Sequence, residues 1–122
     1  SAFHELAAHL PRTLDRETAR RELDVARQAL FCEPDDQSAW WYHADVLRRC
    51  EAEADLVDAE IATLRELRDL EPGSKWPALA LLRLLLRTPR AATHVEVARL
   101  HADLRRIDPA HAHMYGADAP VI

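Results

Sequence analysis

The stretch LFCEPDDQSAWWYH, residues 30–43, decides the fold of this chain, because its acidic-proline pair returns twice. Glu33-Pro34 is followed by Glu71-Pro72 and then by Asp108-Pro109, at spacings of 38 and 37 residues. A fixed period of this length is typical of helical repeat arrays, in which each unit buries its apolar face against its neighbours. Such arrays bind or scaffold other molecules, so the period favours a binding protein over a self-contained enzyme.

Aromatic residues follow the turns in a related pattern. Ser38-Ala39-Trp40-Trp41 has a fainter forerunner in residues 1–4, and Ser74-Lys75-Trp76-Pro77 comes 36 positions later. Buried aromatic side chains dominate the energy of a core, so we interpret these residues mainly as packing residues. Trp41 and Tyr42 point away from the face of Trp40, so we expect one of them at the surface or at an interface.

Composition limits the class of protein further. The 122 residues suit one domain, and two glycines among abundant Ala, Leu, Arg and Glu favour helices over sheets. A charged fraction of 30% with 48% hydrophobic residues indicates a folded chain. The net charge is −5 and no basic stripe is present, which argues against nucleic acid as a partner.

Cysteine usage and the absence of targeting signals suggest a cytoplasmic protein. Cys32 and Cys50 do not form a CxxC pair, so we interpret each as a small buried or half-buried residue in a reducing compartment. No signal peptide is visible, and the richest apolar run, residues 76–86, is too short to cross a bilayer. Ser1 falls in what reads as the second helix of a unit, so we expect a piece of a longer array or a truncated homologue.

Proline and capping signals predict where helices begin and end. The expected helices are 2–10, about 15–32, 36–50, 55–70, 74–87 and 93–108. No Gly or Pro separates residues 36 and 70, so one long helix is an alternative there, but the repeat favours a break near 53–55. Thr93 and Glu96 have the spacing of a capping box.

These elements predict an all-α fold, an α-α superhelix in which antiparallel helical hairpins of 37–38 residues form a right-handed solenoid. We expect one domain over residues 1–115, made of a half unit (1–11), full units at about 13–50 and 55–87, and a last helix at 93–108. A loose tail over 116–122 would follow. Two positions in each unit should be equivalent core positions. Five residues before each proline stand Ala29, Leu67 and Leu104. Two residues before each proline stand Cys32, Leu70 and Ile107.

The stretch from Glu22 to Leu47 resembles a repeat of the protein prenyltransferase α subunit family, in particular that of Rab geranylgeranyltransferase. The family's acidic-proline turn, its Ala-Trp pair and its Tyr followed by a basic residue match Asp35 to Trp40 and then Tyr42-His43. Residues 70–76 resemble the turn into that subunit's last repeat. The family usually continues with Arg-Trp, where this chain has Ala44-Asp45.

The resemblance implies a non-catalytic scaffold that binds a β subunit. That β subunit would hold the zinc and the geranylgeranyl diphosphate and transfer the lipid to C-terminal cysteines of Rab proteins, which an escort protein presents. No cofactor is expected in this chain, and it shows no Ser-His-Asp set or phosphate-binding glycine loop. A tetratricopeptide-like protein-binding module without a transferase role is the alternative, although its period is about 34 residues.

Two sets of residues follow as candidates. The repeat signature and packing set contains Pro34, Trp40, Tyr42, Pro72, Trp76 and Pro109; the partner-surface set contains Trp41, His43, Leu81 and Leu85. The leucine-rich helix 76–87 is apolar nearly all round, so neighbouring hairpins or a partner must cover it. Open apolar ends would also favour self-association of the chain. His94, His101, His111 and His113 match no firm zinc pattern, and we expect no metal.

Overall fold

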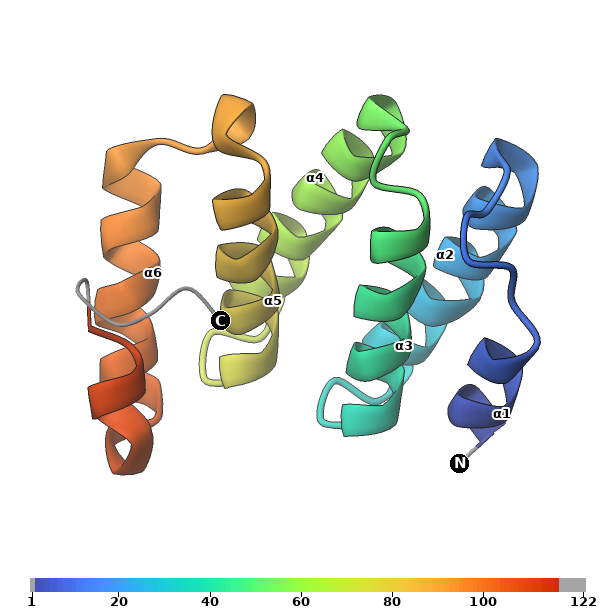
Figure 1. Ribbon diagram of the computed structural model, residues 1–122. Coiled ribbons are helices and arrows are strands. Elements are labelled where there is room, and N and C mark those ends of the chain that lie inside the picture. The colour runs from blue at the N-terminus through green and yellow to red at the C-terminus, as the bar shows by residue number, and fades with distance from the viewer. Residues whose placement is uncertain (1, 117–122) are drawn as a thin grey trace. The chain divides into compact units, whose positions relative to one another are not determined.

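The computed structural model describes residues 2–116, which form an all-α helical repeat (Figure 1). The elements are α1 (Ala2–Ala8), α2 (Arg16–Cys32), α3 (Gln37–Arg49), α4 (Ala54–Leu70), α5 (Lys75–Arg87), η1 (Pro89–Ala91), α6 (His94–Ile107) and η2 (Pro109–Met114), where η marks a 3-10 helix. The all-α fold is thus confirmed. The predicted loose tail, apart from Gly116, lies outside the described residues.

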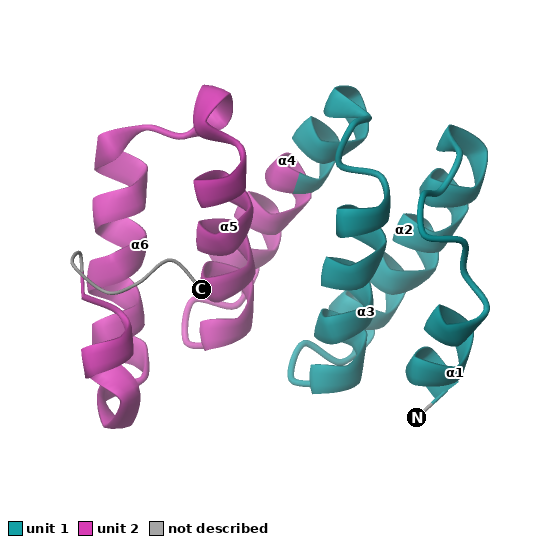
Figure 2. Cartoon of the chain, viewed as in Figure 1, with its two compact units in different colours: residues 1–60 teal, residues 61–122 magenta. Residues whose placement is uncertain are grey.

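The chain divides into two compact units, residues 1–60 and 61–122, and the boundary falls inside α4 (Figure 2). In unit 1, α3 packs against both α2 and α1. In unit 2, α6 packs against α5 on one side and carries η2. A single domain over 1–115 and a right-handed winding of the hairpins stay predictions.

The three acidic-proline turns begin with the same backbone hydrogen bond. The amides of Glu33, Glu71 and Asp108 each donate to the carbonyl four residues earlier at 2.9 Å, which closes α2, α4 and α6. Proline then prevents further helix, because its ring disfavours the helical conformation of the residue before it. Glu33, for example, leaves the helical region with φ −137° and ψ 82°. The sequence period is therefore also a period of backbone structure.

Side-chain caps start four of the helices. Asp15, Asp36, Ser74 and Thr93 accept a hydrogen bond from an amide in the first turn of α2, α3, α5 and α6. These caps satisfy donors that have no partner inside the helix. The expected capping box at Thr93 is only half formed, because the carboxylate of Glu96 accepts from Arg65 instead.

The predicted break between two helices near residues 53–55 is confirmed. Cys50 ends α3 with φ −132° and ψ 20°, and the Glu53 carbonyl accepts from Leu56 and Val57, so that α4 begins at Ala54. Arg49 holds the end of α3 against the preceding loop, since its guanidinium donates to the carbonyls of Leu10 and Pro11. A tertiary contact thus marks the break in place of glycine or proline.

The prediction of equivalent core positions holds for two of the three residues at the first position and is wrong at the second. Five residues before the prolines, Leu67 and Leu104 are buried and Ala29 is half-buried. Two residues before them, Cys32 and Leu70 are exposed and Ile107 is half-buried. Those residues are the last of α2, α4 and α6.

Candidate functional site

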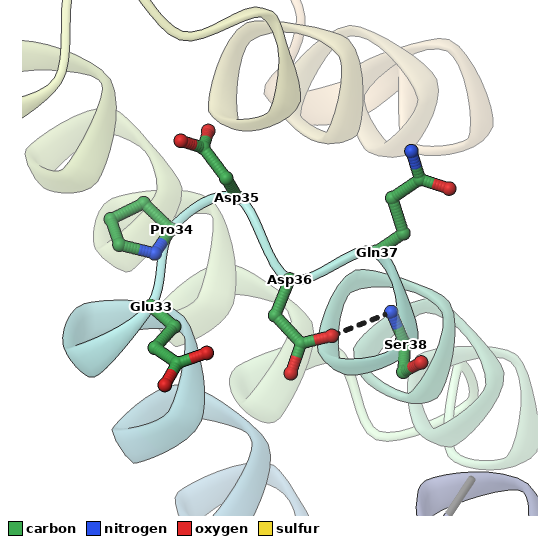
Figure 3. A pocket seen from close by; sticks show the side chains of 6 residues that line it. All are labelled: Glu33, Pro34, Asp35, Asp36, Gln37 and Ser38. Carbon is green, nitrogen blue, oxygen red and sulfur yellow. Dashed lines mark hydrogen bonds between the residues drawn. The ribbon is translucent and has the colours of Figure 1, made fainter.

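The first acidic-proline turn surrounds an open hollow lined by residues 33–38 (Figure 3). The carboxylate of Asp36 is used as a helix cap, since it accepts from the amide of Ser38 at 3.0 Å. The Trp40 indole donates to the carbonyl of Pro34 at 2.6 Å, which ties the first turn of α3 back onto the loop. These contacts give the turn a structural role.

Two members of the packing set, Trp40 and Tyr42, are buried in the structure. Trp40 is 6% exposed and Tyr42 is fully buried, and the Tyr42 hydroxyl donates to Glu22 of α2 at 2.6 Å. Burial, together with this hydrogen bond, raises the pKa of Tyr42. Trp76 is half-buried with the Lys75 ammonium 4.9 Å from its ring centroid. Pro34 is half-buried, while Pro72 and Pro109 are exposed at their turns.

The partner-surface set needs a correction. Trp41 is 38% exposed and its ring stacks on His4 of α1, with ring centroids 4.2 Å apart. His43, Leu81 and Leu85 are instead buried inside the chain. Leu81 and Leu85 are fully buried on α5, which packs against α6. His43 faces the Glu60 carboxylate of α4, so these three side chains are not available on the surface.

A buried charged cluster that was not predicted from the sequence joins α2, α3 and α4. The carboxylate of Glu60 is fully buried and accepts from the Arg27 guanidinium, and its other oxygen lies 2.9 Å from Nε2 of His43. Because a carboxylate can only accept, Nε2 carries the proton. Burial alone would raise the pKa of Glu60, but His43 and Arg27 outweigh it and hold the pKa below its ordinary value.

A repeat signal for this cluster was present in the sequence. Arg27 and Arg65 both stand seven residues before a proline. Arg27 of α2 binds Glu60 of α4, and Arg65 of α4 binds both carboxylate oxygens of Glu96 in α6 at 2.8 and 3.0 Å. The same arginine position therefore links each first helix to the next one along the chain.

Asp45 fills the place where the sequence departs from the family pattern. It is buried and accepts from Arg48 and Arg49, each at 2.9 Å. Arg49 in turn donates to the loop carbonyls before α2. The departure thus forms an ion-pair cluster that fastens α3 to the loop between α1 and α2.

The two thiols differ in their surroundings, which corrects one expectation. Cys32 is exposed rather than buried, at the end of α2, whereas Cys50 is buried. Burial, followed by the charge of Glu60, raises the pKa of Cys50 to about 11. Both cysteines are free thiols.

Two of the four histidines named in the sequence, His101 and His111, have structural contacts. Nδ1 of His101 lies 3.1 Å from the Tyr115 carbonyl, and Nδ1 of His111 lies 3.1 Å from the Asp108 carboxylate. Within residues 2–116, no three His, Cys, Asp or Glu side chains gather as a metal site. Among the helices described, none combines the length and the apolar character that crossing a bilayer requires.

Comparison with known proteins agrees with the turn pattern. No model of a known protein family matches the chain. The chain is 29% identical over 79 residues to geranylgeranyl transferase type-2 subunit alpha of Schizosaccharomyces pombe, a match that covers 53% of this chain and 23% of that protein. The protein of the same name from Dictyostelium discoideum is 26% identical over 99 residues, covering 77% and 32%.

The chain thus spans about a quarter to a third of the length of these relatives. The resemblance to the prenyltransferase α subunit predicted from the acidic-proline turns is confirmed: the chain is similar to part of geranylgeranyl transferase type-2 subunit alpha.

Proposed function

We propose that this chain is part of the α subunit of a Rab geranylgeranyltransferase and serves as a non-catalytic scaffold. The observation that carries the proposal is the similarity to two such α subunits, in a chain whose helices repeat around acidic-proline turns. The partner would be the β subunit, which would hold the zinc and the geranylgeranyl diphosphate. The complex would act in the cytoplasm on Rab proteins presented by an escort protein.

The contacts inside the chain support a positional role. The charged side chains described above are used to join helices, as in Arg27–Glu60 and Arg65–Glu96, or to cap them, as in Asp36. A rigid helical surface can hold a catalytic subunit and its substrate in a productive geometry without taking part in bond chemistry. The contribution of this chain would thus be affinity and orientation.

A tetratricopeptide-like module that binds peptides is the second candidate. It also uses helical hairpins, but its period is about 34 residues. The spacings of 38 and 37 residues here favour the transferase subunit. The two candidates differ in their partner, because only the first requires a folded β subunit.

Co-expression tests the proposal directly. We expect the chain, joined to the remainder of its α subunit or alone, to co-purify with a geranylgeranyltransferase β subunit. We expect the complex with the full α subunit to transfer a geranylgeranyl group to a Rab protein when the escort protein is present. Failure of the full α subunit to bind any such β subunit, or to support transfer, would contradict the proposal and favour the peptide-binding alternative.

Trp41 is the candidate contact that remains exposed. Exposed tryptophans are frequent energetic centres of interfaces. We expect Trp41→Ala to weaken binding of the β subunit by about tenfold or more. The matched control is Val95→Ala on α6, whose side chain is 66% exposed. Equal affinities of the two variants for the β subunit would show that Trp41 is not part of the interface. The co-purification test of the proposed function does not depend on this result.

A further inference from the structure

The third acidic-proline turn begins like the first two but does not lead into an α-helix. The amides of Asp36, Ser74 and His111, each two residues after a proline, donate at 3.1 Å to the carbonyl of the acidic residue three positions earlier. After the first two turns, α3 and α5 follow. After the third, the chain forms η2, with a kink at His111 where φ is −116° and ψ is 23°.

The residue at the N-cap position differs between the third turn and the first two. Asp36 and Ser74 accept a hydrogen bond from an amide of the helix that they begin. His111 stands at the corresponding position, and its ring binds the carboxylate of Asp108 instead. Without a side-chain cap, an α-helix lacks one of the contacts that satisfy its first amides, and a short 3-10 helix is a common substitute.

Tyr115 nevertheless stands at the position where the first turn has its aromatic residue, Trp40. It follows Pro109 by six residues, as Trp40 follows Pro34. Trp40 is 6% exposed and bonds back to the Pro34 carbonyl, and Tyr115 is 5% exposed and donates to the Asp108 carboxylate at 2.9 Å. Both aromatic residues therefore fold back onto their own turn and are buried there.

The face of α6 under Tyr115 is suited to a polar segment. The Tyr115 carbonyl accepts from Arg105 at 2.8 Å and lies 3.1 Å from Nδ1 of His101. At the same distances before the first proline, α2 has Leu30 and Ala26, both fully buried. Apolar residues in α2 thus give way in α6 to two side chains that hold a backbone carbonyl.

We propose that residues 109–115, here called the clasp, cover one face of α6. The corresponding face of α2 is covered by a second helix. Tyr115 anchors the clasp through its buried ring and its hydroxyl, and Arg105 and His101 hold its backbone. The clasp packs on α6 as α3 packs on α2. The clasp therefore competes with any helix, including one from a second copy, for this face of α6.

Amide hydrogen exchange of the full chain tests the clasp. The Tyr115 amide donates to the Ala112 carbonyl at 3.0 Å and reports on the clasp directly. We expect Tyr115→Ala and Arg105→Leu each to speed exchange of the residue 115 amide by about tenfold, the loss of roughly one or two stabilising contacts. The control is Met114→Ala, because Met114 is 43% exposed; its exchange should stay within about twofold of the original.

Two further readouts make the result decisive. Exchange in α5 should be unchanged in Arg105→Leu, which shows that unit 2 remains folded. If Tyr115→Ala unfolds unit 2, the test uses Tyr115→Phe, which keeps the ring and removes only the hydrogen bond to Asp108. This variant should speed exchange of the residue 115 amide several-fold. Exchange at residue 115 that is equally fast in all variants and in the original chain would overturn the clasp.

Discussion

Glu60 is a fully buried carboxylate whose partners come from two other helices, Arg27 of α2 and His43 of α3. Removing one member of a buried ion pair leaves the others without a partner in a place that water reaches poorly. Arg27 is 34% exposed at its side chain and can turn toward solvent, which softens the loss. Glu60 therefore has a far larger role than a surface carboxylate.

Glu60→Gln should lower the free energy of unfolding by about 3 kcal/mol, near the low end for a broken buried pair. Glu96, which pairs with Arg65 as Glu60 pairs with Arg27, provides the control. The Arg65–Glu96 pair has the same helix-to-helix arrangement, but the Arg65 side chain is 45% exposed. Glu96→Gln should therefore cost less than about 1 kcal/mol. Urea unfolding of both variants measures the difference, and equal losses would contradict the special role of Glu60.

The same carboxylate predicts how stability depends on pH. The folded pKa of Glu60 lies below its ordinary value of 4.5, because His43 and Arg27 outweigh burial. Its contribution is then complete above pH 4.5 and is lost as the pH falls through the folded pKa. The stability gap between the original chain and Glu60→Gln should narrow from pH 5 to pH 3. A gap that is constant across this range would contradict the assignment.

Asp36 decides where α3 begins, and it is the element-scale test of the turn. Its carboxylate accepts from the Ser38 amide at 3.0 Å. Asp36→Ala should lower the free energy of unfolding by about 1 kcal/mol, the usual cost of a lost N-cap. Asp35→Ala is the matched control, since Asp35 is an exposed carboxylate in the same turn. In thermal unfolding, the midpoint of Asp36→Ala should lie below that of Asp35→Ala. Equal midpoints would contradict the capping role of Asp36.

Element boundaries were predictable because they depend on local chemistry. Pro34, Pro72 and Pro109 stop helices through their own rings, and Asp15, Ser74 and Thr93 cap through their own side chains. The clasp was not predicted, because its residues lack helical periodicity and its position depends on Arg105 and His101 of another element.

Candidate surface residues were predicted less well than elements, for a physical reason. The sequence period places Leu81, Leu85 and His43 on helices but does not say which face each helix turns inward. Leu81 and Leu85 proved to be core residues, and His43 binds Glu60. Glu60 itself lies seventeen residues from His43, a separation that no local pattern joins.

At the scale of the whole molecule, α4 belongs to both compact units. Its first residues lie in unit 1 with Glu60, and the rest, from Ile61 on, lie in unit 2. A helix shared in this way cannot unfold in one unit without losing backbone hydrogen bonds in the other. Repeat arrays behave as chains of neighbouring units whose coupling comes from such shared contacts.

We therefore expect the two units to unfold in a single transition. The Trp76→Phe variant leaves Trp40 and Trp41 to report on unit 1, and a variant with Trp40→Phe and Trp41→Phe leaves Trp76 to report on unit 2. Circular dichroism of each variant reports on all helices and corrects for the change in stability that the substitutions cause. In each variant, the fluorescence and dichroism midpoints in urea should coincide, because coincident probes are the mark of two-state unfolding. If the units unfold separately, the fluorescence midpoint will lie above the dichroism midpoint in one variant and below it in the other. That result would contradict the single transition and would mean that α4 breaks near Glu60.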